Sequence, residues 1–154
     1  MNILFVGRRT SQESVGVMKK IAGQITALGR LGCQVWSTDI DADGGWLEHD
    51  AQRQKIWDLR RYIPAGLSPH LNSGHTFLQA AQQNDVHFDV CYIRKPLVDN
   101  LHLKTLQVLR QKGTTIVEEI PTYPYDDELK RQGSLSSKVF LAVDRHYRKK
   151  LHRY

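Results

Sequence analysis

The sequence predicts an α/β protein with one mostly parallel sheet that helices cover on both faces. Short apolar runs alternate along the chain with longer stretches of helical periodicity, which is typical of parallel strands joined by right-handed crossovers. The 154 residues are the size of one domain with a substantial core. We find no internal repeat, low-complexity tract or linker, so residues 1–154 are expected to form a single domain.

The first half of the chain predicts two strands, a helix and a hairpin. The apolar run "MNILFVG" predicts a buried first strand that Gly7 ends. Residues 17–28 carry apolar side chains at helical spacing, and this helix could be capped by Thr10 or Ser14 and ended by Gly32. The run "CQVWSTDI" predicts a second strand. After the turn-forming "DADGGW", the runs "WLEHD" and "QKIWDLRRY" could form the arms of a hairpin.

The second half predicts two more strands and three helices. Proline and glycine predict a loop over residues 63–74, with Ser73 as the cap of a short helix. "FDVCYI" predicts a buried strand. Asp99 is the expected N-cap of a helix that Gly113 ends, and "TTIVEEI" predicts another strand. Residues 136–154 predict a last helix with an apolar stripe.

The basic charge of the protein lies mostly in the last helix. The net charge is +6, and residues 138–153 hold six of the 22 Lys and Arg but one of the 16 acids, so the rest of the chain carries only +1. A basic helix can face solvent, an anionic membrane or nucleic acid. We expect peripheral contact with an anionic membrane and no nucleic-acid partner.

The cysteines and histidines give no sign of a metal site. Cys33 and Cys91 lie in apolar runs and are expected to be buried, reduced thiols. The seven histidines are scattered, and no Cys/His spacing resembles a zinc site, so we expect neither metal nor cofactor. The chain has no signal peptide or apolar run long enough for a membrane span, which predicts a cytoplasmic location.

The candidate ligand site lies at the carboxyl ends of the parallel strands, where ligands of such sheets bind. Loops are expected to leave this edge after Gly7, Thr38, Ile93 and Ile120. The first loop has neither the G-x-G-x-x-G fingerprint of dinucleotide sites nor a P-loop pattern. Gly16 lies near a predicted helix N-terminus, where backbone N–H groups could bind an anion, or where a glycine could simply allow close packing.

Charged residues end two of the strands at this edge. Arg94 could bind a phosphate, a carboxylate or sugar hydroxyl groups, or it could be a surface arginine that pairs with Asp99 or with a neighbouring loop. Strand alternation directs Glu118 and Glu119 to opposite faces, so only one of them can face the ligand crevice. Glu119 lies nearer the exit of the strand, and we expect its carboxylate to accept hydrogen bonds from a hydroxylated ligand.

The loop "IPTYPYDDE" follows these two acids. Pro121 and Pro124 stiffen it, while Tyr123 and Tyr125 offer flat faces with polar tips that suit sugar rings. A proline-rich turn whose tyrosines pack on the last helix would explain the same residues. The predicted substrate-binding residues are Gly16, Arg94, Glu119, Tyr123 and Tyr125; no catalytic residue is predicted.

Three phrases of the sequence resemble glycosyltransferases with the GT-B fold, most closely the large retaining family four. "MNILFVG", followed by a glycine-containing loop and "KKIAGQITALGRLGCQVW", resembles the start of such an enzyme. Within it, "LGRLGCQVW" is similar to the family's "LxxxGHxV" phrase, with Cys33 in place of the usual histidine. "DVCYIRKP" resembles the "DVIYIRYP" strand of members that build surface polysaccharides, and "IVEEIPTYPYDDEL" resembles their "VVLEIPTYPYDKE" loop. The chain departs from the family where Val15-Gly16 replaces a Gly-Gly pair and where many relatives carry a histidine near "EIP".

The resemblance implies a Rossmann-like N-terminal domain that binds a saccharide or lipid-linked acceptor. A nucleotide-sugar would bind to a C-terminal domain that is absent from these 154 residues, so we expect a truncated chain that is inactive alone. The parent enzyme would transfer a sugar with retention of configuration and without a metal. A non-enzymatic α/β binding or regulatory module is the alternative interpretation.

Overall fold

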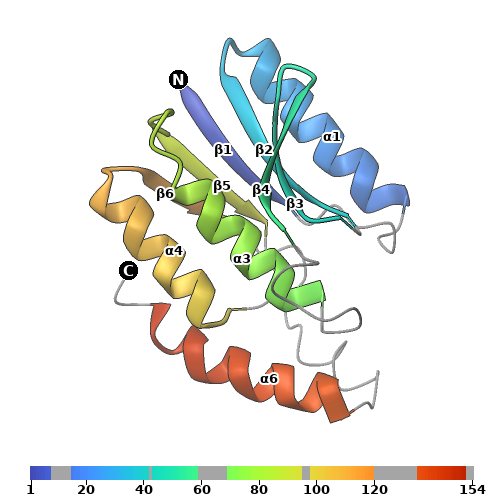
Figure 1. The fold of residues 1–154 in the computed structure, drawn as a ribbon, viewed down its shortest axis with the longest axis vertical. Helices are drawn as coiled ribbons and strands as arrows, with labels where there is room; N and C mark the ends of the chain where they lie inside the picture. Colours follow the sequence, from blue (N-terminus) through green and yellow to red (C-terminus); the bar gives the residue numbers. More distant parts are fainter. Residues whose placement is uncertain (8–14, 42, 59–68, 95–97, 120–134, 152–154) are drawn as a thin grey trace.

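The computed structural model confirms the α/β fold class. It describes residues 1–7, 15–41, 43–58, 69–94, 98–119 and 135–151, and the predicted caps Thr10 and Ser14 lie outside these ranges. Six strands form one mixed, mostly parallel sheet in the order β4-β3-β2-β1-β5-β6 (Figure 1). The architecture is compatible with a Rossmann-like fold.

Four parallel strands form the main part of the sheet. Their bounds are β1 Asn2–Gly7, β2 Gln34–Ile40, β5 Val90–Arg94 and β6 Thr115–Glu118. β1 lies between β2 and β5, and residues 3–6 of β1 are buried, as the apolar run "ILFV" predicts. The carboxyl ends of the four strands therefore lie at one edge of the sheet.

The predicted hairpin is confirmed and extends the sheet in the antiparallel direction. It consists of β3 (Gly45–His49) and β4 (Gln52–Trp57), and β3 pairs with β2. Asp50 and Ala51 form the turn with φ of 46° and 63°. Two successive residues with positive φ match the twist of a two-residue hairpin, a conformation that is unusual for alanine.

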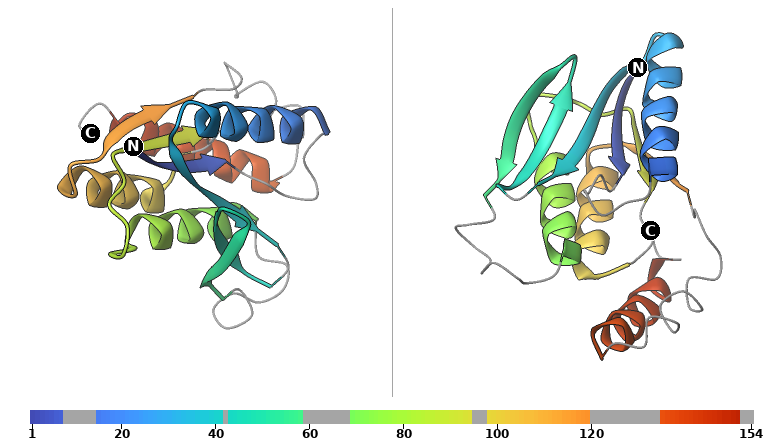
Figure 2. Two further views of the ribbon diagram at one scale, coloured as in Figure 1. Left: turned by 90° about the horizontal axis from the view of Figure 1, so that it is seen from above. Right: turned by 90° about the vertical axis from the view of Figure 1, so that its right-hand side faces the viewer.

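Helices cover both faces of the sheet, as the sequence predicts. α1 (Val15–Arg30) lies on one face, whereas α3 (Pro69–Ala81) and α4 (Asn100–Gln111) lie side by side on the other (Figure 2). The main core forms between the sheet and these two helices. α6 (Leu135–Arg148) lies beyond the carboxyl ends of the parallel strands (Figures 1 and 2).

Two helix ends agree with the sequence and two local predictions were wrong. The Asp99 carboxylate caps α4 by accepting from the His102 backbone N–H at 2.7 Å, and Gly113 follows α4 with a φ of 77°. α3 begins at Pro69 and not at Ser73, because proline fits the first turn of a helix, where its missing N–H has no acceptor to lose. Cys33 lies before β2 and is half-buried, whereas Cys91 is fully buried.

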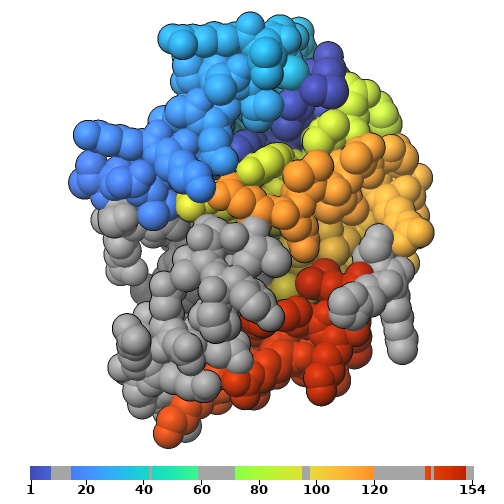
Figure 3. All heavy atoms as spheres, turned by 180° about the vertical axis from the view of Figure 1, so that it is seen from behind, coloured from blue at the N-terminus to red at the C-terminus, as the bar shows by residue number. Residues whose placement is uncertain are grey.

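The face of the sheet that carries α1 is covered only in part. β6 is an edge strand, and it reaches the surface beside α1 in the view from behind (Figure 3). Thr115 and Val117 are exposed there, with 41% of Val117 accessible. The open area adjoins the carboxyl edge of the sheet.

Candidate functional site

Five polar side chains meet at the carboxyl edge, and we call them the edge cluster: Lys20, Gln24, Tyr92, Arg94 and Glu119. The Glu119 carboxylate is at the centre. Its Oε1 lies 2.7 Å from Lys20 Nζ and 3.3 Å from Arg94 Nε. Its Oε2 accepts from Tyr92 OH at 2.8 Å and from Gln24 Nε2 at 3.0 Å.

Secondary structure brings these residues together from three distant segments. Lys20 and Gln24 are one turn apart on α1 and therefore share a face of that helix. Tyr92 and Arg94 are two residues apart on β5 and share a face of the strand, where the Tyr92 ring stacks on Phe5. The backbone N–H of the residue after β6, Glu119, still donates to the carbonyl oxygen of Ile93 at 2.8 Å, which fixes its side chain beside β5.

The surroundings of Glu119 strongly favour its ionised form. Burial by itself would raise the carboxyl pKa, but hydrogen bonds from Lys20, Gln24 and Tyr92 and the charge of Arg94 lower the pKa to about 2. Burial and the hydrogen bond to Glu119 raise the pKa of the Tyr92 phenol. At neutral pH the cluster therefore holds a carboxylate and a protonated tyrosine.

Glu119 has little capacity left for an external hydrogen-bond donor. A carboxylate offers about four lone-pair sites, and Glu119 faces four donor groups of the protein. Two other polar atoms of the cluster are unsatisfied: among the described residues, the buried Arg94 Nε and Gln24 Oε1 have no hydrogen-bond partner. The Arg94 side chain is 10% exposed and lies near Glu119 without a well-directed Nε–H bond.

Glu118 points to the opposite face of the sheet, as strand alternation predicts. Its Oε1 lies 2.6 Å from Nε2 of His102 in the first turn of α4. The His102 side chain is buried, and its Nδ1 has no hydrogen-bond partner in the described part of the chain. Each of the adjacent acids therefore contacts a different helix, Glu118 contacting α4 and Glu119 contacting α1.

The structure brings together two of the five predicted site residues, Arg94 and Glu119. Gly16 lies in the first turn of α1, and no atom of the described residues lies within 4 Å of where its side chain would begin, so packing against the described part of the chain does not explain this glycine. Tyr123 and Tyr125 lie outside the described residues.

Sequence analysis missed three members of the cluster: Lys20, Gln24 and Tyr92. The spacing of Lys20 and Gln24 on a polar helix face and the two-residue spacing of Tyr92 and Arg94 were the available signals. Of the pairs predicted as an alternative for Arg94, with Asp99 or with a neighbouring loop, the structure has Arg94 beside Glu119, the residue that follows β6.

α6 is held at the same edge by a buried acid that the sequence did not single out. Asp144 is 1% exposed, accepts from the Val98 backbone N–H at 2.6 Å and pairs with Arg148. Leu141 is buried on the same helix, and Tyr147 packs against the main core. These contacts anchor the basic helix to the chain segment that leads into α4.

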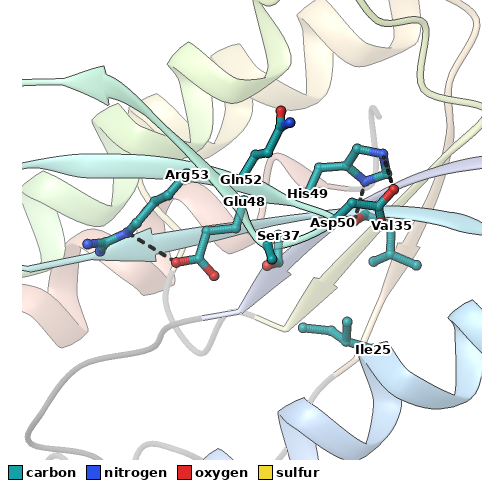
Figure 4. A pocket seen from close by; sticks show the side chains of 9 residues that line it. Ile25, Val35, Ser37, Glu48, His49, Asp50, Gln52 and Arg53 are labelled. Atoms are coloured by element: carbon teal, nitrogen blue, oxygen red, sulfur yellow. Dashed lines mark hydrogen bonds and ion pairs between the residues drawn. The ribbon is translucent and has the colours of Figure 1, made fainter.

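A hollow lies between α1 and the hairpin, away from the edge cluster (Figure 4). Its volume is about 340 Å³. Ile25 and Val35 supply apolar surface, and Glu48 pairs with Arg53 at 3.1 Å. Arg53 also pairs with Asp39 and Asp41 and lies over the Trp46 ring, so this one cation faces three carboxylates and the group keeps a negative formal charge.

The described ranges also bear on metal binding and membrane spanning. No group of three or more His, Cys, Asp or Glu side chains is arranged there to hold a metal ion. None of the helices in these ranges has the length and apolarity needed to span a bilayer. Comparisons with protein-family models, with curated protein sequences and with solved structures found no match to this chain.

Proposed function

We propose that this chain is the acceptor-binding half of a glycosyltransferase with the GT-B architecture. Its parent protein transfers a sugar from a nucleotide-sugar to a saccharide or lipid-linked acceptor in surface polysaccharide synthesis. The donor binds to a further domain, so these 154 residues alone do not catalyse transfer. Retention of configuration and independence of metal belong to the same proposal.

One observation carries this proposal: all five residues of the edge cluster come from the phrases that resemble the family. Lys20 and Gln24 belong to "KKIAGQITALGRLGCQVW", Tyr92 and Arg94 to "DVCYIRKP", and Glu119 to "IVEEIPTYPYDDEL". These segments are distant in sequence and meet at the edge where ligands of parallel sheets bind.

In this proposal the cluster binds and orients the acceptor. The planar guanidinium of Arg94 can direct hydrogen bonds to acceptor oxygens, and Lys20, whose side chain is 54% exposed, adds a mobile positive charge. Glu119 is a positioning residue, because its oxygens already face the donors of Lys20, Arg94, Gln24 and Tyr92. This role differs from the direct contact with acceptor hydroxyls expected from the sequence.

A non-enzymatic α/β binding module is the second candidate. The saturation of Glu119 favours it, because a carboxylate that only joins α1 to the sheet would have the same partners. The two candidates make different predictions for a variant that lacks one hydrogen-bond donor of the edge cluster. The variant transfers sugar more slowly if the chain belongs to a transferase, whereas a binding module has no transfer rate to reduce.

The proposal can be tested with the whole protein that contains this chain, supplied with labelled nucleotide-sugars and saccharide or lipid-linked acceptors. Arg94→Lys keeps the charge but removes the planar donor, so kcat/KM for the acceptor should fall about ten- to a hundredfold with donor KM unchanged. Arg30→Lys makes the same exchange on the exposed last turn of α1 and should have no effect. Saccharide binding without any transfer would support the binding module, and equal rates for the Arg94 and Arg30 variants would refute the assigned site.

A further inference from the structure

The edge cluster has the composition of an oxyanion site that an internal carboxylate fills. Two cations, an amide N–H and a phenol O–H converge on the two oxygens of Glu119. This donor set matches what proteins direct at phosphate and carboxylate groups of ligands. The formal charge is +1, because Lys20 and Arg94 outweigh Glu119, so the site keeps an attraction for anions.

Glu119 leaves two buried groups of this site unsatisfied. The Nε–H of Arg94 is a donor without an acceptor, and Gln24 Oε1 is an acceptor without a donor, among the described residues. Buried polar groups without partners are unusual in folded proteins. Both atoms belong to side chains that contact Glu119, so a group that replaced its carboxylate could reach both.

We propose that the edge cluster binds a phosphate or carboxylate group of a hydroxylated ligand, which takes the place of the Glu119 carboxylate on Lys20 and Arg94. The anionic group accepts from Arg94 Nε and Lys20 Nζ, and a ligand hydroxyl donates to Gln24 Oε1. A sugar phosphate or a uronic acid has both kinds of group. The inference rests on the proposed function for one point only, that this ligand is the sugar acceptor.

A ligand anion can replace Glu119 as the partner of Lys20 at low cost. The Lys20 side chain is half exposed, and an ion pair that water reaches contributes little stability. Arg94 is nine-tenths buried, so an acceptor aligned with its Nε gains a charged hydrogen bond that Glu119 does not supply. Glu119 therefore competes with the ligand for the same donors. Removing its charge while keeping its shape should strengthen anion binding.

The test is calorimetric titration of this chain with inorganic phosphate and, separately, with acetate at neutral pH and low salt. Glu119→Gln raises the cluster charge to +2, and we expect phosphate to bind about ten- to a hundredfold more tightly than to the unchanged chain. Lys20→Met should weaken phosphate binding at least about tenfold. Stronger binding of phosphate than of acetate assigns a phosphorylated ligand, and the reverse order assigns a carboxylated one.

Two matched controls separate this site from general charge effects. Glu118→Gln removes the same charge on the opposite face of the sheet and should leave phosphate affinity unchanged. Lys19→Met removes the neighbouring exposed cation and should also have no effect.

Equal affinities for the Glu119→Gln and Glu118→Gln variants, or for the Lys20→Met and Lys19→Met variants, would overturn the inference. Circular dichroism shows whether each variant is folded. If Glu119→Gln is unfolded, the comparison of Lys20→Met with Lys19→Met decides the outcome, because both lysines are exposed. Anion binding needs no sugar transfer, so its failure leaves the proposed transferase standing. Failure of the transferase assay, in turn, leaves the anion site standing.

Discussion

Replacing Glu119 by glutamine should destabilise the protein at neutral pH by an amount that shrinks in acid. The Glu119 carboxyl pKa is about 2 in the folded protein, whereas a free glutamate side chain titrates at 4.5. This difference corresponds to an upper limit of about 3 kcal/mol of folding free energy at pH 7. Water reaches the 17% exposed Glu119 side chain and the half-exposed Lys20, so screening should reduce the measured value to about 2 kcal/mol.

The direction in which this stabilisation changes with pH follows from proton binding. Because the folded pKa is depressed, the unfolded chain binds more protons than the folded chain between pH 4.5 and about 2. The stabilisation is complete above pH 4.5 and is lost as the pH falls through about 2. At pH 3 it should have fallen to about 40% of its neutral value.

Urea unfolding of the unchanged chain and of Glu119→Gln at pH 7, 4.5 and 3 measures this effect. The difference in unfolding free energy between the two proteins removes the contribution of the other titrating groups. A difference that stays constant from pH 7 to pH 3 would refute the account of the edge cluster as an electrostatic network.

Three further predictions concern the rest of the molecule. Titration calorimetry with a panel of nucleotide-sugars should detect no micromolar binding by this chain, because the proposal assigns donor binding to another domain; micromolar affinity for any of them would contradict that assignment. Replacing Lys149 and Lys150, which directly follow α6, by glutamine should weaken binding to anionic vesicles at low salt by about 2 kcal/mol in co-sedimentation, and an unchanged chain that does not sediment at low salt would remove the idea that α6 and these lysines face lipid. Asp144→Ala leaves the Val98 N–H without its acceptor and removes the ion pair with Arg148, so it should destabilise the fold by about 2 kcal/mol, whereas Asp144→Asn keeps an acceptor and should destabilise it less in thermal unfolding.

Local sequence signals predicted the strands and most helix ends because these features depend on near neighbours. The apolar run of β1, the capping carboxylate of Asp99 and the positive φ of Gly113 each have a cause within a few residues. The start of α3 was missed because Pro69 and Gly74 suggest a loop by composition. In the structure Gly74 allows α3 to approach α4, since a β-carbon there would lie 3.0 Å from Leu101 Cδ1.

The candidate site could be predicted only in part because its contacts link distant segments. Strand alternation predicted that Glu118 and Glu119 diverge, and the edge of the sheet predicted that Arg94 and Glu119 could be near each other. Nothing local indicated that Lys20 would reach Glu119, 99 residues away, or that Asp144 would be buried against Val98. Sequence periodicity places such residues on a helix face but does not determine which distant segment that face meets.

The central place of β1 has a consequence for the order of folding. β1 pairs with β2 and with β5, and Asn2 is hydrogen-bonded to Asp89, 87 residues further along the chain. During synthesis on the ribosome, β1 emerges long before β5, so one edge of the earliest strand stays unpaired while the local β3–β4 hairpin can already form. Contacts of such large sequence separation slow folding, and a nascent chain that pauses before β5 would expose the unpaired backbone N–H and C=O groups of this β1 edge to other chains.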